Sequence, residues 1–164
     1  MSNKKLIIDF TTSSKLPWTV INDNVMGGLS EGHAELQSQA LRFYGLISTD
    51  NNGGFTSVYS APIKLSKSIE AISITIKGDG NRYQLRMRSS VMGRELVYKV
   101  DFLTKTNQTE TYRFLFSDFK ASFRGSIVVD APDLKANTVT KVGFLIGPNQ
   151  KKMFLLSVYK IEFH

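Results

Sequence analysis

The sequence predicts an all-β protein built as a sandwich of two antiparallel sheets, and three observations support this prediction. Apolar and polar residues alternate with a period of two in many short segments, which is the pattern of strands with one buried face. Turn-forming clusters of Gly, Asn, Asp and Pro separate these segments. No segment shows the apolar repeat of a long amphipathic helix. About ten short strands at this spacing are typical of a β-sandwich.

The length and composition fit one folded domain. The chain has 164 residues, 41% of them hydrophobic, which is enough for one core, so we expect a single domain over residues 1–164. Cysteine is absent, which excludes disulfides, thiolate metal ligands and a cysteine nucleophile. The N-terminus holds no apolar run of signal-peptide length, and no window approaches the roughly 18 apolar residues of a membrane span. We therefore expect a cytoplasmic protein without a membrane span.

The formal net charge of +7 favours anionic partners. The Lys and Arg residues are spread along the chain rather than clustered, so the charge also fits a role in solubility alone. We do not expect a nucleic-acid-binding protein.

The N-terminal third is predicted to hold short strands and two related loops. The expected strands are residues 6–10, 34–36 and 41–47. Residues 18–30, which include the only Trp, are expected to form a rigid loop rather than a strand, because Asn, Asp and paired Gly favour turns. Residues 50–57 repeat the order of Asn or Asp before Gly-Gly. A further strand is expected to start at Phe55 and to end before Pro62.

Residues 69–117 show the clearest alternation. Four strands are expected, and their apolar positions are Ile72, Ile74 and Ile76, then Tyr83, Leu85 and Met87, then Tyr98, Val100 and Phe102, then Tyr112, Phe114 and Phe116. Gly78-Asp79-Gly80-Asn81 is predicted to be a hairpin turn, and turns are also expected at 92–94 and 106–108. The four strands are therefore predicted to form an antiparallel meander with one apolar and one polar face.

The C-terminal part is predicted to hold a long crossing and two strands. Residues 117–136 are expected to cross the sandwich, with Phe119 and Phe123 anchoring them to the core. Residues 131–134 begin with Ala-Pro, which suits one helical turn. The expected strands are residues 139–146 and 153–163.

Four motifs, in this order, resemble those of the complex I intermediate-associated protein 30 family. They are Asn22-Asp23-Asn24-Val25-Met26-Gly27-Gly28-Leu29-Ser30, Asn51-Asn52-Gly53-Gly54-Phe55-Thr56-Ser57, Gly78-Asp79-Gly80-Asn81-Arg82-Tyr83 and Phe123-Arg124-Gly125. The resemblance extends from about Phe10 to Phe163. It implies a jelly roll of the galactose-binding-domain type and, as in mitochondrial members, a link to assembly of respiratory NADH:ubiquinone oxidoreductase. This chain lacks an evident transit peptide and resembles a stand-alone version of the family.

The two Asn-Gly-Gly loops offer a first set of candidate binding residues. Asn22, Asp23, Asn51 and Asn52 are expected at one end of the sandwich, where such folds commonly bind ligands. The alternative is that these side chains bond the loop backbone and stiffen the rim. Asp23, Asp50 and Asp79 are acids near turns, but no calcium-loop spacing is present, so we predict no metal site.

The polar face of the predicted meander offers a second set. It would carry Gln84, Arg86, Arg88, Lys99, Asp101 and Arg113. Arginine recognises carboxylates, phosphates and sugar hydroxyls, so this face is a candidate surface for a glycan or an anionic ligand. The alternative is a solvated sheet face with cross-strand pairs.

Other residues carry weaker functional signals. Trp18, Tyr44 and Tyr59 are expected to pack in or against the core. His33 and His164 are the only histidines, which disfavours a His-based triad or a multi-His metal site. No dinucleotide fingerprint is present, so no cofactor is expected. We therefore predict a non-enzymatic binding module for a protein partner, similar to complex I assembly factors. The alternative is a carbohydrate-binding module that uses the concave sheet face.

Overall fold

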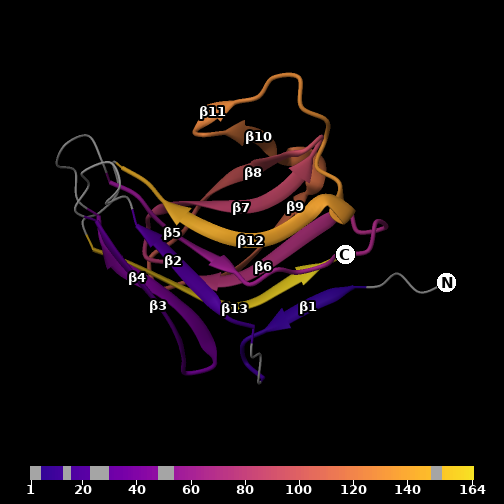
Figure 1. The fold of residues 1–164 in the computed structure, drawn as a ribbon. Coiled ribbons are helices and arrows are strands. Elements are labelled where there is room, and N and C mark those ends of the chain that lie inside the picture. The colour runs from indigo at the N-terminus through magenta and orange to yellow at the C-terminus, as the bar shows by residue number, and fades with distance from the viewer. Residues whose placement is uncertain (1–4, 13–15, 23–29, 48–53, 149–152) are drawn as a thin grey trace.

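The computed structural model describes residues 5–12, 16–22, 30–47, 54–148 and 153–164, and they form two antiparallel sheets packed against each other (Figure 1). One sheet has seven strands in the order β11 (Ser126–Ile127), β10 (Lys120–Phe123), β8 (Arg94–Leu103), β7 (Arg82–Val91), β12 (Val139–Ile146), β5 (Thr56–Ser60) and β2 (Trp18–Asn22). The other has six strands, with β3 (Glu31–Gln37), β4 (Ala40–Leu46), β13 (Met153–Phe163), β6 (Ala71–Lys77) and β9 (Thr109–Leu115) in order and β1 (Leu6–Asp9) paired to β13. The predicted β-sandwich is confirmed.

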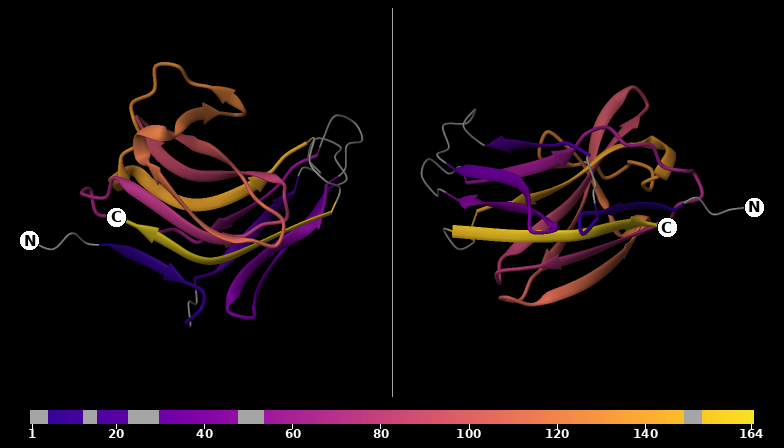
Figure 2. Two further views of the ribbon diagram at one scale, coloured as in Figure 1. Left: turned by 180° about the vertical axis from the view of Figure 1, so that it is seen from behind. Right: turned by 90° about the horizontal axis from the view of Figure 1, so that it is seen from below.

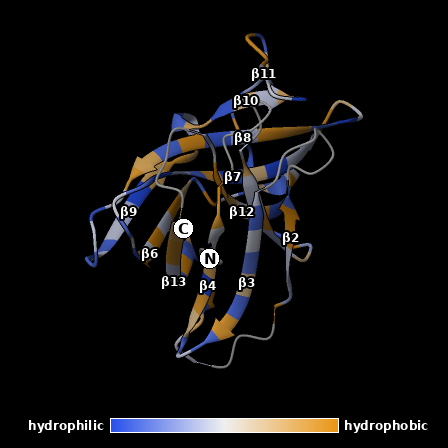
Figure 3. Ribbon diagram, turned by 90° about the vertical axis from the view of Figure 1, so that its left-hand side faces the viewer, coloured by the Kyte–Doolittle hydropathy of each residue, from blue (hydrophilic) through white to orange (hydrophobic). Residues whose placement is uncertain are grey.

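The core lies between the sheets and is built from the apolar positions of the alternating strands. Ile72, Ile74 and Ile76 on β6 are completely buried, and they face Leu85 and Met87, which are equally buried on β7. The alternation is visible as hydrophobic and hydrophilic bands along the strands (Figure 3). The prediction that these residues face inward while their polar neighbours face outward is therefore confirmed.

The predicted four-strand meander is wrong. Strands β7 and β8 form a hairpin with a turn at Met92–Gly93, as expected, but β6 and β9 pair with each other in the opposite sheet. The segment 78–81 is therefore a connection between the two sheets and not a hairpin turn, and so is the segment after β8. The physical reason is that a period of two reveals which side of a strand is buried but not which strand it pairs with.

Asp79 fixes the connection between β6 and β7. Its carboxylate accepts hydrogen bonds from the Asn81 backbone N–H at 3.0 Å, the Asn81 side-chain amide at 2.8 Å and the Tyr83 hydroxyl at 3.0 Å. It also accepts one from the Leu155 backbone N–H on β13 at 2.8 Å. Four donors on one carboxylate tie the chain reversal to both sheets.

Gly78 is required by close packing at the same connection. A β-carbon at Gly78 would lie 2.7 Å from Cγ2 of Thr104, which is closer than carbon atoms approach in folded proteins. The Thr104 hydroxyl in turn donates to the Asn81 carbonyl at 2.7 Å. Glycine at position 78 therefore lets the connection between β6 and β7 lie beside the connection between β8 and β9.

Two further local predictions differ from the structure. Residues 18–22 form strand β2, paired with β5, and not the start of a loop. The partly buried Trp18 packs against the core, with its ring 5.7 Å from that of Phe10, so its predicted core packing is confirmed. Residues 131–134 are not helical. Single 3-10 turns occur instead at η3 (Phe116–Asp118) and η4 (Ala136–Thr138). Among the described residues, no helix has the length and apolar character needed to cross a membrane.

Candidate functional site

The outer face of the seven-stranded sheet gathers most of the polar candidates. Strand β12 is bowed, with its hollow side turned away from the six-stranded sheet, and the β10–β11 hairpin forms one edge of the seven-stranded sheet (Figures 1 and 2). We call this outward side of β2, β5, β12, β7, β8 and β10 the concave face. Among the described residues, its charged side chains are Arg82, Arg86, Arg88, Lys99, Lys120, Lys141, Glu95 and Asp101. Cations therefore clearly outnumber carboxylates on this face.

Three cations lie in one cross-strand row of the concave face. Arg86 on β7 is paired directly with Lys99 on β8, and Lys99 is paired directly with Lys120 on β10. Like charges that face each other across neighbouring strands destabilise a sheet. The row is therefore a local concentration of positive charge that the fold holds in place.

Tyr59 anchors the other end of this row. Its ring lies over Gly143, where a β-carbon would come within 2.5 Å of Cδ1 of Tyr59. The Arg88 guanidinium covers the ring at 4.1 Å from the ring centroid, a cation–π contact. Arg86 Nη1 donates to the Tyr59 hydroxyl at 3.2 Å. Tyr59 is only 3% exposed as a result, although it lies on an outer face.

The two arginines are held in fixed positions by these contacts. Arg86 Nε donates to Gln84 Oε1 at 3.0 Å, and Arg88 forms an ion pair with Glu95 at 3.5 Å. The buried Nε of Arg88 has no acceptor among the described residues. A guanidinium carries five N–H donors, so the contacts named here leave other donors of each arginine for a ligand.

The structure brings together four of the sequence-predicted site residues and separates one. Gln84, Arg86, Arg88 and Lys99 share the concave face, where Asp101 is paired with Gln84. Arg113 is not part of it, because β9 belongs to the other sheet and pairs Arg113 with Ser73 of β6. The expectation that Arg113 lies with the others is wrong, for the same reason that the predicted meander is wrong.

Asn22 occupies a structural position inside the sandwich. Its side-chain oxygen accepts from the Thr56 hydroxyl at 2.6 Å and from the Gly32 backbone N–H at 3.0 Å. These bonds join β2, β3 and β5, as the alternative reading of the loops predicts. Asp23, Asn51 and Asn52 lie outside the described residues, so their role as ligands stays a prediction.

Sequence reasoning missed Tyr59, Lys120 and Lys141 as members of the site. Tyr59 was expected only to pack, and its neighbours Ser57 and Ser60 gave no signal that it faces outward. Lys120 lies in a segment that was expected to be a crossing and instead contains strand β10. Its place beside Lys99 depends on the strand order, for which the sequence holds no local signal.

Metal-binding and histidine chemistry have little support in the described residues. Within these ranges, no three or more His, Asp or Glu side chains are grouped so that they could hold a metal ion. His164 Nε2 lies 2.8 Å from the Ser73 hydroxyl, whereas His33 packs beside Tyr44 on β3 and β4.

The chain matches one known protein family over most of its length. The family model described as complex I intermediate-associated protein 30 matches residues 8–158, which is nearly the whole chain. The chain belongs to this family. No curated protein sequence matches it.

Several solved structures similar to this family member are modules described as carbohydrate-binding. A family 11 carbohydrate-binding module of a cellulosomal cellulase of Clostridium thermocellum aligns with a TM-score of 0.73 at 14% identity, over 99% of this chain and 95% of that one. The family 11 module of the same organism in complex with a β-1,3-1,4-mixed-linked tetrasaccharide gives 0.70 at 14% identity, over 99% and 96%. A family 30 module gives 0.62 at 14% identity, over 95% and 87%. At such identities the likeness establishes the jelly-roll fold of this complex I intermediate-associated protein 30 family member.

Proposed function

We propose that this protein is a non-enzymatic binding module that serves the assembly of a multi-subunit complex by holding an anionic segment of a partner protein on its concave face. Family membership supports the link to assembly, and similar folds among the solved structures belong to modules described as carbohydrate-binding. The residues proposed to contact the partner are Arg86, Arg88, Lys99 and Lys120.

The cross-strand row of Arg86, Lys99 and Lys120 is the observation that carries this proposal. A sheet that served only as a scaffold would gain stability from opposite charges at these paired positions. Carboxylates of a partner would relieve the repulsion, and the two arginines are already ordered by Tyr59, Gln84 and Glu95. Binding would therefore require little further ordering of side chains.

A polyglutamate probe tests whether the concave face binds anions. The double variant Lys99→Gln with Lys120→Gln is compared with the control Lys64→Gln with Lys67→Gln, which removes the same charge from exposed positions outside the sheets. We expect the affinity for polyglutamate to fall about tenfold in the first variant and to stay close to wild type in the control. Equal losses in both variants would refute a specific site on this face.

The assembly role is tested with the protein in its native organism. Tagged wild-type protein and both double variants are purified, and co-purified proteins are identified by mass spectrometry. We expect subunits of respiratory NADH:ubiquinone oxidoreductase with the wild type and the control, but not with the concave-face variant. If such subunits are absent from every sample under all growth conditions, the assembly role is wrong even where polyglutamate binds.

Glycan binding on the same face is the second candidate function. The structural neighbours described as carbohydrate-binding modules and the grouping of Gln84, Arg86 and Asp101 favour it. However, Tyr59 is the single aromatic among the paired strand residues of this face in the described part of the chain, and Arg88 covers it. A pyranose ring normally stacks on an uncovered aromatic ring. Affinity electrophoresis in mixed-linkage β-glucan distinguishes the two functions, because binding of a neutral glycan depends little on salt.

A further inference from the structure

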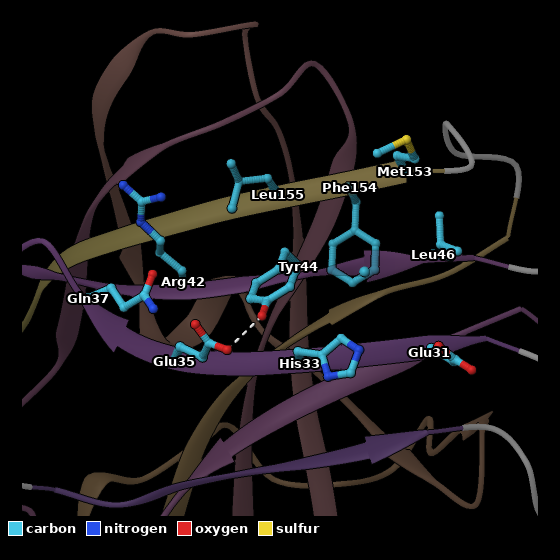
Figure 4. A pocket seen from close by; sticks show the side chains of 11 residues that line it. Glu31, His33, Glu35, Gln37, Arg42, Tyr44, Leu46, Met153, Phe154 and Leu155 are labelled. Carbon is cyan, nitrogen blue, oxygen red and sulfur yellow. Dashed lines mark hydrogen bonds between the residues drawn. The ribbon is translucent and has the colours of Figure 1, made fainter.

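A second surface with a different character lies on the outer side of the six-stranded sheet. A groove of about 560 Å³ crosses β3, β4 and β13, and we call it the outer groove (Figure 4). Its lining combines exposed aliphatic side chains on β4 and β13 with carboxylates on β3. It is separated from the concave face by the whole thickness of the sandwich, because the two faces belong to different sheets.

The strand register arranges the outer groove in cross-strand rows. One row runs from Glu31 through Leu46 to Met153, and the next runs from His33 through Tyr44 to Leu155. Neighbouring strands lie about 4.8 Å apart, so a carboxylate on β3 and an aliphatic side chain on β13 are separated by about 10 Å. A third row pairs Glu35 directly with Arg42, so the β3 side of the groove is acidic at Glu31, across from the apolar residues of β4 and β13.

The apolar side is unusually exposed for side chains of this size. Met153 is 73% exposed, and Leu46 and Leu155 are each 41% exposed. Single exposed aliphatic residues are common on protein surfaces, but three on adjacent positions of paired strands form a continuous patch. Such a patch is typical of a surface that contacts a partner.

The acidic side is ordered. The Tyr44 hydroxyl donates to Glu35 Oε1 at 2.7 Å, and this bond with the carboxylate raises the pKa of Tyr44. The rings of His33 and Tyr44 lie 5.3 Å apart between Glu31 and Glu35 (Figure 4). Aromatic faces beside carboxylates are an arrangement that attracts a cationic side chain.

We infer that the outer groove is a second docking site, and that its occupant is an extended partner segment in which a Lys or Arg and a large aliphatic residue stand two positions apart. Residues two apart in an extended chain point to the same side and lie about 6.8 Å apart. A segment that crosses the strands can thus place its cation over Glu31 and its aliphatic side chain over Leu46 and Met153. The inference is independent of the concave face, which attracts the opposite charge. A protein with both sites could join two partner segments.

Synthetic peptides provide the test. The probe contains Lys-Ser-Leu-Ser-Leu between glycine ends, and two controls replace its Lys by Glu or both Leu by Ser. Backbone amide shifts in two-dimensional NMR spectra report where each peptide binds. We expect the probe to shift amides of β3, β4 and β13. The Glu control should bind at least threefold more weakly, and the control without Leu should cause no shifts.

Two variants of the protein connect binding to the named side chains. Met153→Ser and Glu31→Lys alter exposed residues, so both should fold, and Glu70→Lys is the matched charge control elsewhere on the surface. We expect weaker probe binding with the first two and unchanged binding with the third. Equal binding of all three peptides, or no effect of Met153→Ser and Glu31→Lys, would overturn the inference. Shifts of the same amides by a β-glucan tetrasaccharide, with the probe peptide inactive, would assign the groove to carbohydrate instead.

Discussion

At the scale of single residues, Asp79 shows how much of a local motif depends on distant partners. The order Gly-Asp-Gly-Asn correctly indicates a reversal of the chain, because glycine and Asx residues favour turns. It does not show that the Asp79 carboxylate also accepts a bond from Leu155, a residue 76 positions later. That partner is set by the packing of β13 beside β6, which no short motif encodes.

Asp79→Asn is expected to lower the free energy of unfolding by about 2–3 kcal/mol, because hydrogen bonds to a charged acceptor stabilise by more than neutral ones. The Tyr83 hydroxyl, the Leu155 N–H and the Asn81 side chain all donate to the same oxygen, Oδ2. Urea denaturation measures the change. The exposed Asp101→Asn should stay within about 0.5 kcal/mol of wild type. A similar effect of both substitutions would contradict the role given to Asp79.

The buried phenol of Tyr83 leads us to expect a loss of stability at alkaline pH. Burial, and then the charge of Asp79, raise the pKa of this phenol well above its ordinary value. The folded state therefore holds the proton more tightly than the unfolded state, so the contribution is complete below about pH 10 and declines above it. We expect the free energy of unfolding to fall by about 1.4 kcal/mol per pH unit there.

Tyr83→Phe is the matched variant for this pH dependence. Urea denaturation between about pH 8 and pH 11 should show a shallower decline than in the wild type. The decline should not vanish, because burial also raises the pKa values of Tyr98 and Tyr112. Parallel curves for wild type and variant would show that Tyr83 is not the source.

At the scale of the strands, the sequence predicts burial well and pairing poorly. Alternation correctly assigns Leu85 and Met87 to the core and Arg86 and Arg88 to the outside. It wrongly joins β6 and β9 to the β7–β8 hairpin, because every amphipathic strand has the same period whichever sheet it enters. The local sequence of a β-sandwich thus predicts which side of each strand is buried, but it does not predict the order of the strands in the sheets.

The same distinction decides how much of the concave face could be predicted. Gln84, Arg86, Arg88 and Lys99 lie on two strands joined by a short hairpin, so their common face follows from the sequence. Lys120 joins them only because β10 pairs with β8, and Tyr59 only because β5 pairs with β12. Both pairings connect segments far apart in the chain, and for this reason these residues were missed.

Lys99→Gln should raise the stability of the free protein. Lys99 lies between Arg86 and Lys120 on the neighbouring strands, so removal of its charge relieves two repulsions while the stem of the side chain is kept. We expect a gain of about 0.5 kcal/mol in the free energy of unfolding at low salt, measured by urea denaturation. Lys64→Gln, which lies outside the paired strands, should give no such gain. A loss of stability in Lys99→Gln would show that the row is not repulsive.

At the scale of the whole molecule, the two sheets present outer faces of different character. The concave face is basic and polar, whereas the outer groove on the opposite sheet is apolar with an acidic side. If both proposed sites bind as inferred, one domain would offer two surfaces for partner segments of opposite charge. This arrangement suits a module that joins subunits during assembly, since binding at one face leaves the other open.

Salt should have opposite effects on the free protein and on its anionic complex. The chain carries a net charge of +7, and raising the ionic strength from about 0.01 M to about 0.15 M shortens the screening length from about 30 Å to about 8 Å. Repulsion within the concave face is then reduced, and we expect the melting temperature of the free protein to rise by about 2–4 °C. Polyglutamate binding should weaken over the same range, because the attraction is screened as well.

The double variant Lys99→Gln with Lys120→Gln tests which residues cause this salt effect. If the row of Arg86, Lys99 and Lys120 is the main cause of the rise in melting temperature, the variant's melting temperature should change less with sodium chloride than that of the wild type or of the Lys64→Gln with Lys67→Gln control. Differential scanning fluorimetry across the salt series measures all three proteins together. A wild-type melting temperature that falls with salt, or an equal rise in all three proteins, would mean that the basic row does not dominate the electrostatics of the free protein.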